Sequence, residues 1–175
     1  MENIDKIYCI NLDSRPDRWD ECQVEFTKIG IQDKVERLPA YEMSPGIAGC
    51  SKSHLECIKL AKSNNHKNVL ILEDDIKFTD NFSEIYNKAL AQLRRNYDKC
   101  DILYFSANLY GEGNYLIHDN LAKISSAKAG HAYIVQESVY DTIIDAFKDI
   151  DWTDLYNWNH SNPNRSKFSR TTTKS

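Results

Sequence analysis

Val69-Leu70-Ile71-Leu72-Glu73-Asp74-Asp75 is the stretch of sequence that decides the fold of this chain. Four apolar residues are followed at once by three carboxylates, a pattern typical of a buried strand that ends at Glu73. Similar short apolar runs alternate with helical periods along the chain, which predicts an α/β fold. In open α/β sheets ligands bind beyond the carboxyl ends of the strands, so a candidate site is expected at these three carboxylates.

Strands and helices are predicted to alternate on both sides of this stretch. Pro16 at a first helical position and Gly30 after a last turn favour one of the helices, and Ser138 is the expected cap of another. Residues 107–120 show no period and are predicted to be irregular. The expected strands are 7–10, 35–38, 69–72, 102–105, 121–124 and 132–135, and the expected helices are 16–29, 49–62, 82–95 and 139–147. This alternation predicts a mostly parallel sheet with helices on its faces.

The composition is that of one globular domain. Of 175 residues, 41% are hydrophobic and 27% are charged, which excludes a disordered or fibrous chain. We expect the domain in residues 1–155 and a polar, disordered tail in residues 156–175, where no apolar period is present. The net charge of −4 argues against a nucleic-acid-binding protein, which would carry a basic excess.

Targeting and cysteine patterns indicate a cytoplasmic protein. No segment has the length and apolar character of a signal peptide or a membrane span. The five cysteines form no Cys-x-x-Cys pair and have no His at zinc-knuckle spacing. We therefore interpret them as buried, reduced thiols.

Glu73, Asp74 and Asp75 are the candidate metal ligands. Adjacent carboxylates repel each other, so they are either well solvated or neutralised by a cation, and oxygen ligands suit Mg²⁺ or Mn²⁺. Such an ion would join the enzyme to a nucleotide diphosphate. The alternative is an acidic turn that binds nothing.

A second candidate cluster follows the first predicted strand and leads into a helix. Asn11, Asp13, Arg15 and Arg18 are its candidate substrate-binding residues, because helix starts attract anions and guanidinium groups fit phosphate oxygens. The alternative is a capped helix start in which Arg15 and Arg18 pair with Asp13 and Asp17.

Ser53 and His54 lie one turn inside a helix that follows the glycines of residues 46–49. These glycines would let the backbone approach a ligand closely, which makes both side chains candidate substrate contacts. A packing role for His54 is the alternative.

Four further candidates lie in the last third of the chain. His131 and Tyr133, in the segment Gly130-His131-Ala132-Tyr133, are candidate substrate-binding residues. Asp151 and Asp154 are candidate catalytic bases near the end of the patterned region. Ordinary surface chemistry near a helix end is the alternative for both aspartates.

Four segments, in this order and spacing, resemble glycosyltransferase family 25, which includes bacterial lipooligosaccharide galactosyltransferases and collagen galactosyltransferases. Each segment is short, and the resemblance as a whole extends over about residues 6 to 155. The four are Ile7-Tyr8-Cys9-Ile10-Asn11-Leu12-Asp13-Ser14-Arg15-Pro16-Asp17-Arg18, Gly49-Cys50-Ser51-Lys52-Ser53-His54, Leu70-Ile71-Leu72-Glu73-Asp74-Asp75 and Gly130-His131-Ala132-Tyr133-Ile134-Val135.

The resemblance implies an A-type glycosyltransferase fold with a Rossmann-like sheet. It also implies a Mn²⁺- or Mg²⁺-dependent enzyme of glycan or lipopolysaccharide biosynthesis. Such an enzyme moves galactose or glucose from a UDP-sugar to a saccharide or protein acceptor, with inversion at the anomeric carbon. One alternative is a truncated, inactive relative that only binds nucleotide or protein. Another is a receiver-like signalling domain, in which Ser106 would occupy the position of the required aspartate.

Overall fold

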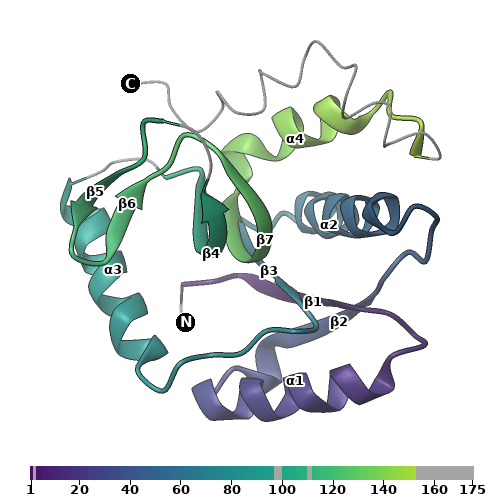
Figure 1. The fold of residues 1–175 in the computed structure, drawn as a ribbon, viewed down its shortest axis with the longest axis horizontal. Helices are drawn as coiled ribbons and strands as arrows, with labels where there is room; N and C mark the ends of the chain where they lie inside the picture. Colours follow the sequence, from purple (N-terminus) through teal and green to yellow (C-terminus); the bar gives the residue numbers. More distant parts are fainter. Residues whose placement is uncertain (2, 97–99, 110–111, 153–175) are drawn as a thin grey trace.

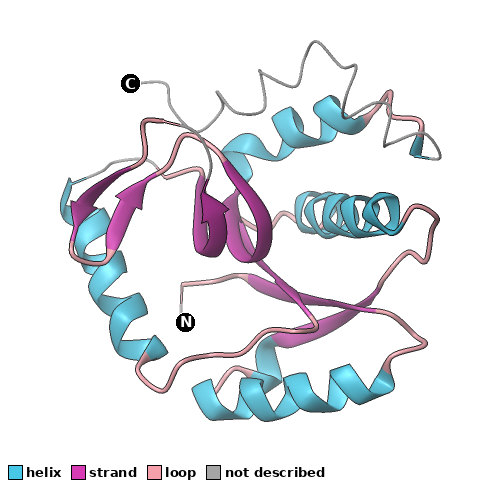
Figure 2. Ribbon diagram, in the orientation of Figure 1, coloured by secondary structure: helices cyan, strands magenta, loops and turns pink. Residues whose placement is uncertain are grey.

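The computed structural model describes residues 1, 3–96, 100–109 and 112–152 (Figure 1). Its helices are α1 (Pro16–Ile29), α2 (Gly46–Ser63), α3 (Phe82–Asn96) and α4 (Tyr140–Phe147), with two short 3-10 helices, η1 (Gln32–Lys34) and η2 (Glu137–Val139). Its strands are β1 (Lys6–Asn11), β2 (Val35–Pro39), β3 (Asn68–Glu73), β4 (Ile102–Leu109), β5 (Tyr115–His118), β6 (Leu121–Lys123) and β7 (Ala127–Gln136). Figure 2 shows how helices and strands alternate and form layers.

The central sheet has the strand order β2-β1-β3-β7-β4. Strands β2, β1 and β3 pair in parallel, whereas β7 is antiparallel to both β3 and β4. Four of the five strands therefore point the same way, which confirms the expected α/β class and mostly parallel sheet.

Helices cover both faces of this sheet, with α1 on one side and α2 and α4 on the other (Figure 1). On β3, Leu70 and Leu72 belong to the core cluster that includes Phe26 of α1 and Tyr86 of α3. Val69 and Ile71 belong to the cluster under α2 and α4. Successive strand residues point to opposite faces, so a strand between two helical layers must be apolar throughout. Each fully buried Leu or Ile contributes about 1.5–3 kcal/mol.

Residues 107–120, expected to be irregular, contain parts of two strands. Strand β4 continues to Leu109, and β5 forms an antiparallel pair with β6 outside the main sheet. Tyr115 and Leu116 on β5 are both exposed, so this hairpin shows none of the alternation on which a sequence prediction depends.

The last helix begins at Tyr140, and Ser138 is not its cap. Ser138 lies in η2 and its hydroxyl donates a 2.8 Å hydrogen bond to Asp101 Oδ1, at the start of β4. The side chain thus joins η2 to the residue that precedes β4 and does not cap α4.

The predictions for the tail, the domain boundary and membrane spans each have a different outcome. The expected tail at 156–175, and Asp154, lie outside the described residues. The domain boundary near residue 155 stays a prediction. Across the described ranges, none of the helices combines the length and the apolar character that crossing a membrane requires.

The three parallel strands end level with one another. Ile10 on β1 is opposite Glu73 on β3, and Asn11 is opposite Pro39 on β2. The polar segments that follow β1 and β3 are therefore brought to one edge of the sheet, although they are about sixty residues apart in sequence.

Candidate functional site at the carboxyl edge of the sheet

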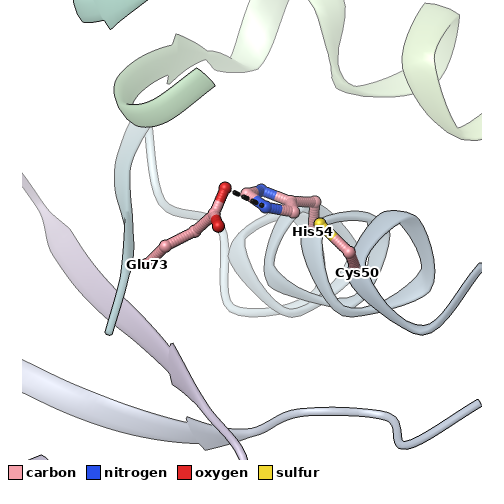
Figure 3. Close-up of side chains that lie close together, drawn as sticks. All are labelled: Cys50, His54 and Glu73. Carbon is pink, nitrogen blue, oxygen red and sulfur yellow. Dashed lines mark ion pairs between the residues drawn. The ribbon is translucent and has the colours of Figure 1, made fainter. Parts of the chain in front are cut away.

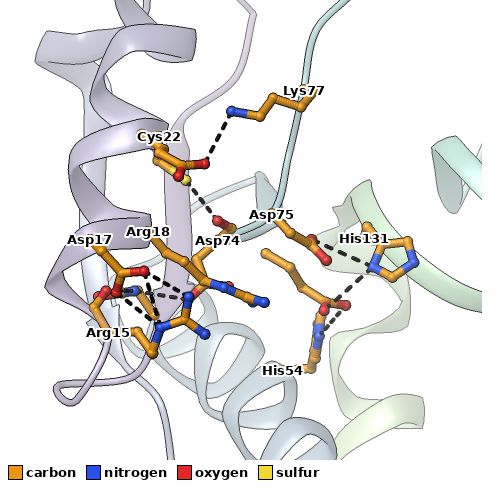
Figure 4. A network of polar contacts seen from close by, with 12 residues as sticks. Arg15, Asp17, Arg18, Cys22, His54, Asp74, Asp75, Lys77 and His131 are labelled. Atoms are coloured by element: carbon orange, nitrogen blue, oxygen red, sulfur yellow. Dashed lines mark hydrogen bonds and ion pairs between the residues drawn. The ribbon is translucent and has the colours of Figure 1, made fainter.

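The three carboxylates that follow β3 do not act as one group. Asp74 turns toward α1, whereas Glu73 and Asp75 turn toward His131 (Figure 4). Asp74 accepts a 2.8 Å hydrogen bond from Asn11 Nδ2 and a 2.9 Å bond from Arg18 Nη1, and its side chain is only 13% exposed. Its carboxylate therefore has partners within the fold, while Glu73 and Asp75 remain together at the edge.

Asn11 organises the turn that follows β1. The residue is 1% exposed, and its amide donates to Arg15 O and Asp74 Oδ2 and accepts from Arg37 Nε. These contacts use the hydrogen-bonding groups of the amide inside the protein. Asn11, expected to bind substrate, thus lies beneath the site and fixes the turn that carries Arg15.

Of the two arginines that the sequence analysis paired with Asp13 and Asp17, only Arg15 forms such a pair. Arg15 does pair with Asp17, and the hydrogen bond from Arg15 lowers the pKa of Asp17 to about 2. Arg18, however, pairs with Asp74, and Asp13 pairs with Arg37 at 2.7 Å. The start of α1 has no side-chain cap. Of the alternative, a capped helix start with paired arginines, only the pairing of Arg15 is therefore correct.

Glu73 lies between two imidazoles. His54 Nε2 is 3.3 Å from Glu73 Oε1, and His131 Nδ1 is 3.4 Å from Glu73 Oε2. Burial by itself raises the pKa of Glu73, but the close contacts with His54 and His131 outweigh it and hold the pKa below its ordinary value. Glu73 is therefore held as a carboxylate at the edge of the sheet.

Tyr133 fixes the ring of His54 from beneath. Its hydroxyl lies 2.8 Å from His54 Nδ1, and the two rings stack with centroids 5.6 Å apart. Burial raises the pKa of Tyr133 well above its ordinary value, so the phenol stays neutral. Tyr133 thus orients His54, which in turn contacts Glu73.

Ser53 is fully buried and does not face the edge. Its hydroxyl donates to Gly49 O and accepts from the Tyr41 backbone N–H. The helix start also lies close to this loop, because a Cβ on Gly49 would be 2.1 Å from Tyr41 O. The glycine and serine therefore anchor the loop before α2 to the helix.

Glu73, Asp75 and His131 form a set of donors that fits a divalent cation. One ligand atom from each lies within 4.8 Å of the others. His131 Nδ1 is buried and makes no well-aligned hydrogen bond within the described residues, but it lies 3.4 Å from Glu73 Oε2 and 3.9 Å from Asp75 Oδ1. Two carboxylates and one imidazole suit Mn²⁺ and related ions. Asp74, the third ligand expected from the sequence, is not part of this group, whereas His131 is; the identity of the metal ligands stays a prediction.

The cysteines divide into two kinds. Cys9, Cys22 and Cys57 are buried free thiols, as expected, and Cys100 is half-buried. Cys50 is instead exposed on α2, which corrects the expectation for that residue. Although the residue is exposed, packing around its thiol, and then the carboxylates of Glu73 and Asp75, raise the pKa of Cys50 to about 11.

The sequence is similar to one known protein family over most of its length. The sequence profile of glycosyltransferase family 25, described as an LPS biosynthesis protein family, matches residues 32–154. This chain belongs to glycosyltransferase family 25. Membership removes the receiver-like alternative and agrees with the resemblance in the four sequence segments.

The relatives of this family 25 chain are longer proteins. It is 29% identical over 157 residues to a "Glycosyltransferase 25 family member" of Drosophila melanogaster, covering 75% of this chain and 25% of that protein. It is 26% identical over 170 residues to a "Procollagen lysyl hydroxylase and glycosyltransferase" of Acanthamoeba polyphaga mimivirus, covering 75% and 18% respectively. The chain therefore spans a quarter or less of the length of these relatives.

The remaining predicted residue of this family 25 chain, Asp151, is exposed. It lies between Ile150 and Trp152, which pack with Ala48 at the start of α2. Its role as a base stays a prediction, as does that of Asp154.

Arg37 is the residue that sequence reasoning missed. Its guanidinium binds Asn11 and Asp13 and lies 6.0 Å from the Trp19 ring. It stands on β2 opposite Cys9 of β1, so only the register of two parallel strands brings it to the turn after β1.

Proposed function

We propose that this family 25 chain is a metal-dependent glycosyltransferase whose donor site lies at the carboxyl edge of the sheet. The observation that supports this most is the convergence of Glu73, Asp75 and His131 on one point, beside the arginine-bearing turn after β1. Ligand sites of open α/β sheets lie at this edge. The donor is a UDP-sugar that carries galactose or glucose, and the acceptor is a hydroxyl of a saccharide or a protein.

The charges at this edge suit a nucleotide diphosphate with a cation. Glu73, Asp75 and His131 would hold Mn²⁺ or Mg²⁺, which supplies positive charge to the diphosphate as it leaves. Without a cation, the diphosphate and the two carboxylates repel each other. Arg15, whose side chain is 42% exposed, is placed to contact phosphate oxygens from the neighbouring turn.

In the proposed reaction the acceptor oxygen bonds to the anomeric carbon as the bond from that carbon to the diphosphate breaks. The configuration of the sugar is inverted in this single displacement. A carboxylate takes the acceptor proton, and Asp151 and Asp154 are our candidates for that base.

The proposal is tested by melting curves of the wild type and Asp75→Asn with UDP-galactose or UDP-glucose, each with Mn²⁺ or with a chelator. ADP-glucose serves as the control nucleotide. Ligand at a hundred times its Kd adds about 2.7 kcal/mol, which raises the Tm of a domain of this size by roughly 5–10 °C. We expect this shift only for the wild type with both UDP-sugar and Mn²⁺.

Other results would contradict the proposal in distinct ways. An equal shift in Asp75→Asn, or a shift that persists with the chelator, would show that the metal site is assigned wrongly. The absence of any shift in the wild type would favour the inactive relative.

A further inference from the structure

A second group of potential metal ligands shares Glu73 with the proposed donor site. Cys50 and His54 lie one turn apart on α2 and both face Glu73 at the end of β3 (Figure 3). One ligand atom from each of the three residues lies within 4.8 Å of the other two. Helix residues four apart lie on one face, so the spacing of Cys50 and His54 directs both side chains toward β3.

The imidazole of this group is already oriented for a metal. Its Nδ1 is engaged by the Tyr133 hydroxyl at 2.8 Å, which leaves Nε2 toward Glu73. Metal-binding histidines are typically held in this way, with the second ring nitrogen bonded to another group. The His54 side chain is only 14% exposed, so the stacked Tyr133 ring and the hydrogen bond restrict its rotation.

The chemistry of the three donors differs from that of the neighbouring group. A thiolate and a carboxylate together cancel the charge of a divalent cation, and sulfur and nitrogen ligands favour Zn²⁺ over Mg²⁺ or Mn²⁺. Three protein ligands leave a fourth tetrahedral position for water. Because Cys50 is exposed, an ion can reach the sulfur from solvent.

We propose that Cys50, His54 and Glu73 form a binding site for a thiolate-preferring divalent cation of the Zn²⁺ class. Glu73 turns Oε1 toward His54 and Oε2 toward His131, so the two groups meet at one carboxylate. Two doubly charged ions at such short range repel each other strongly. Occupation of the thiolate site therefore weakens Mn²⁺ binding by Asp75 and His131, a consequence that rests on the proposed function.

Cobalt spectroscopy of the full 175-residue chain tests the site without any activity measurement. Anaerobic titration with Co²⁺ is expected to give a thiolate-to-cobalt charge-transfer band and the visible spectrum of tetrahedral Co²⁺, both removed by added Zn²⁺. Cys50→Ser should abolish the band, whereas Cys100→Ser and His131→Gln should retain it. Tyr133→Phe should weaken Co²⁺ binding by about 10–100-fold, as losses of such supporting partners do.

Loss of the band in Cys50→Ser must come from loss of the thiolate and not from unfolding. Circular dichroism checks that Cys50→Ser is folded, which is expected because Cys50 is exposed. A wild type without the charge-transfer band, or a band that persists in Cys50→Ser, would overturn the proposal.

Manganese binding, followed by electron paramagnetic resonance, tests the antagonism. One equivalent of Zn²⁺ should raise the Kd for Mn²⁺ by at least about tenfold in the wild type through repulsion between the ions, and by clearly less in Cys50→Ser, where Zn²⁺ can act only by direct competition at Asp75 and His131. An unchanged Kd would refute the antagonism. A wild type that binds no Mn²⁺ would count against the metal site of the proposed function, and the cobalt titration would still decide the thiolate site.

Discussion

Arg18 Nη1 lies 2.9 Å from Asp74 Oδ1, and this ion pair joins the first turn of α1 to the turn after β3. The two residues are 56 positions apart in sequence. With Asn11, which also donates to Asp74, the pair draws the central acidic side chain away from its neighbours. The middle residue of the triplet therefore supports the site, and the outer two face the open edge.

Alanine substitutions of Asp74 and Asp75 should separate these two roles. Asp74→Ala leaves the amide of Asn11 and the guanidinium of Arg18 without their shared acceptor, so we expect it to lower the free energy of unfolding by about 2 kcal/mol. Asp75, whose side chain is 51% exposed, should change it by less than about 0.5 kcal/mol when replaced by alanine. Urea unfolding with a chelator present measures both. Equal losses would show that Asp74 does not hold the two turns together.

Gly49 and Gly46 offer a matched pair on α2. A Cβ on Gly49 would lie 2.1 Å from the backbone oxygen of Tyr41, so Gly49→Ala forces the loop away from the helix and should cost about 1–3 kcal/mol. Nothing lies within 4 Å of a Cβ on Gly46, and Gly46→Ala should be neutral or stabilise the helix by up to about 1 kcal/mol. Thermal unfolding compares the two variants, and similar Tm values would contradict the close approach of Tyr41 to α2.

Tyr133 and Tyr140, which pack in the same core cluster, should respond differently to loss of the hydroxyl. Tyr133→Phe leaves His54 Nδ1 without its partner and should lower the free energy of unfolding by about 1 kcal/mol. The Tyr140 hydroxyl is buried and has no hydrogen-bond partner in the part of the chain that the structure describes. Tyr140→Phe should therefore be neutral or stabilising. Denaturant titration provides the comparison, and a larger loss at Tyr140 would reveal a partner for its hydroxyl.

The depressed pKa of Glu73 predicts how stability depends on pH. Its folded pKa lies below its unfolded value, so its contribution is fully present above the ordinary carboxyl pKa of about 4.3 and is lost as pH falls through the lower folded value. The difference in free energy of unfolding between the wild type and Glu73→Gln should shrink over that acidic range. Measurements with a chelator at several pH values test this. A difference that grows toward acid would mean that the imidazoles do not stabilise the carboxylate.

Local sequence patterns determined most of the architecture around β3. The apolar run of β3, Pro16 at the start of α1 and Gly30 in the left-handed conformation at its end are recognisable without coordinates, because periodicity and chain punctuation depend on neighbouring residues. The same patterns placed the acidic segment and the turn after β1 at one edge, since parallel strands end on the same side.

Strand pairing, which no local pattern specifies, decided two other features. They are the hairpin of β5 and β6 and the antiparallel position of β7 between β3 and β4. The division of the acidic triplet had no signal of this kind, because β3 ends at Glu73 and both Asp74 and Asp75 lie in the turn that follows it.

The sequence by itself thus determined that this chain is an α/β protein with carboxylates at the end of a central strand. Only the tertiary structure decided which groups meet those carboxylates. His54 on α2 and His131 on β7 meet at Glu73, and Arg18 on α1 meets Asp74, because the packing of helices and strands on β3 brings distant segments within hydrogen-bonding distance. Such contacts depend on how whole elements pack, whereas sequence periodicity reports only which face of one element is buried.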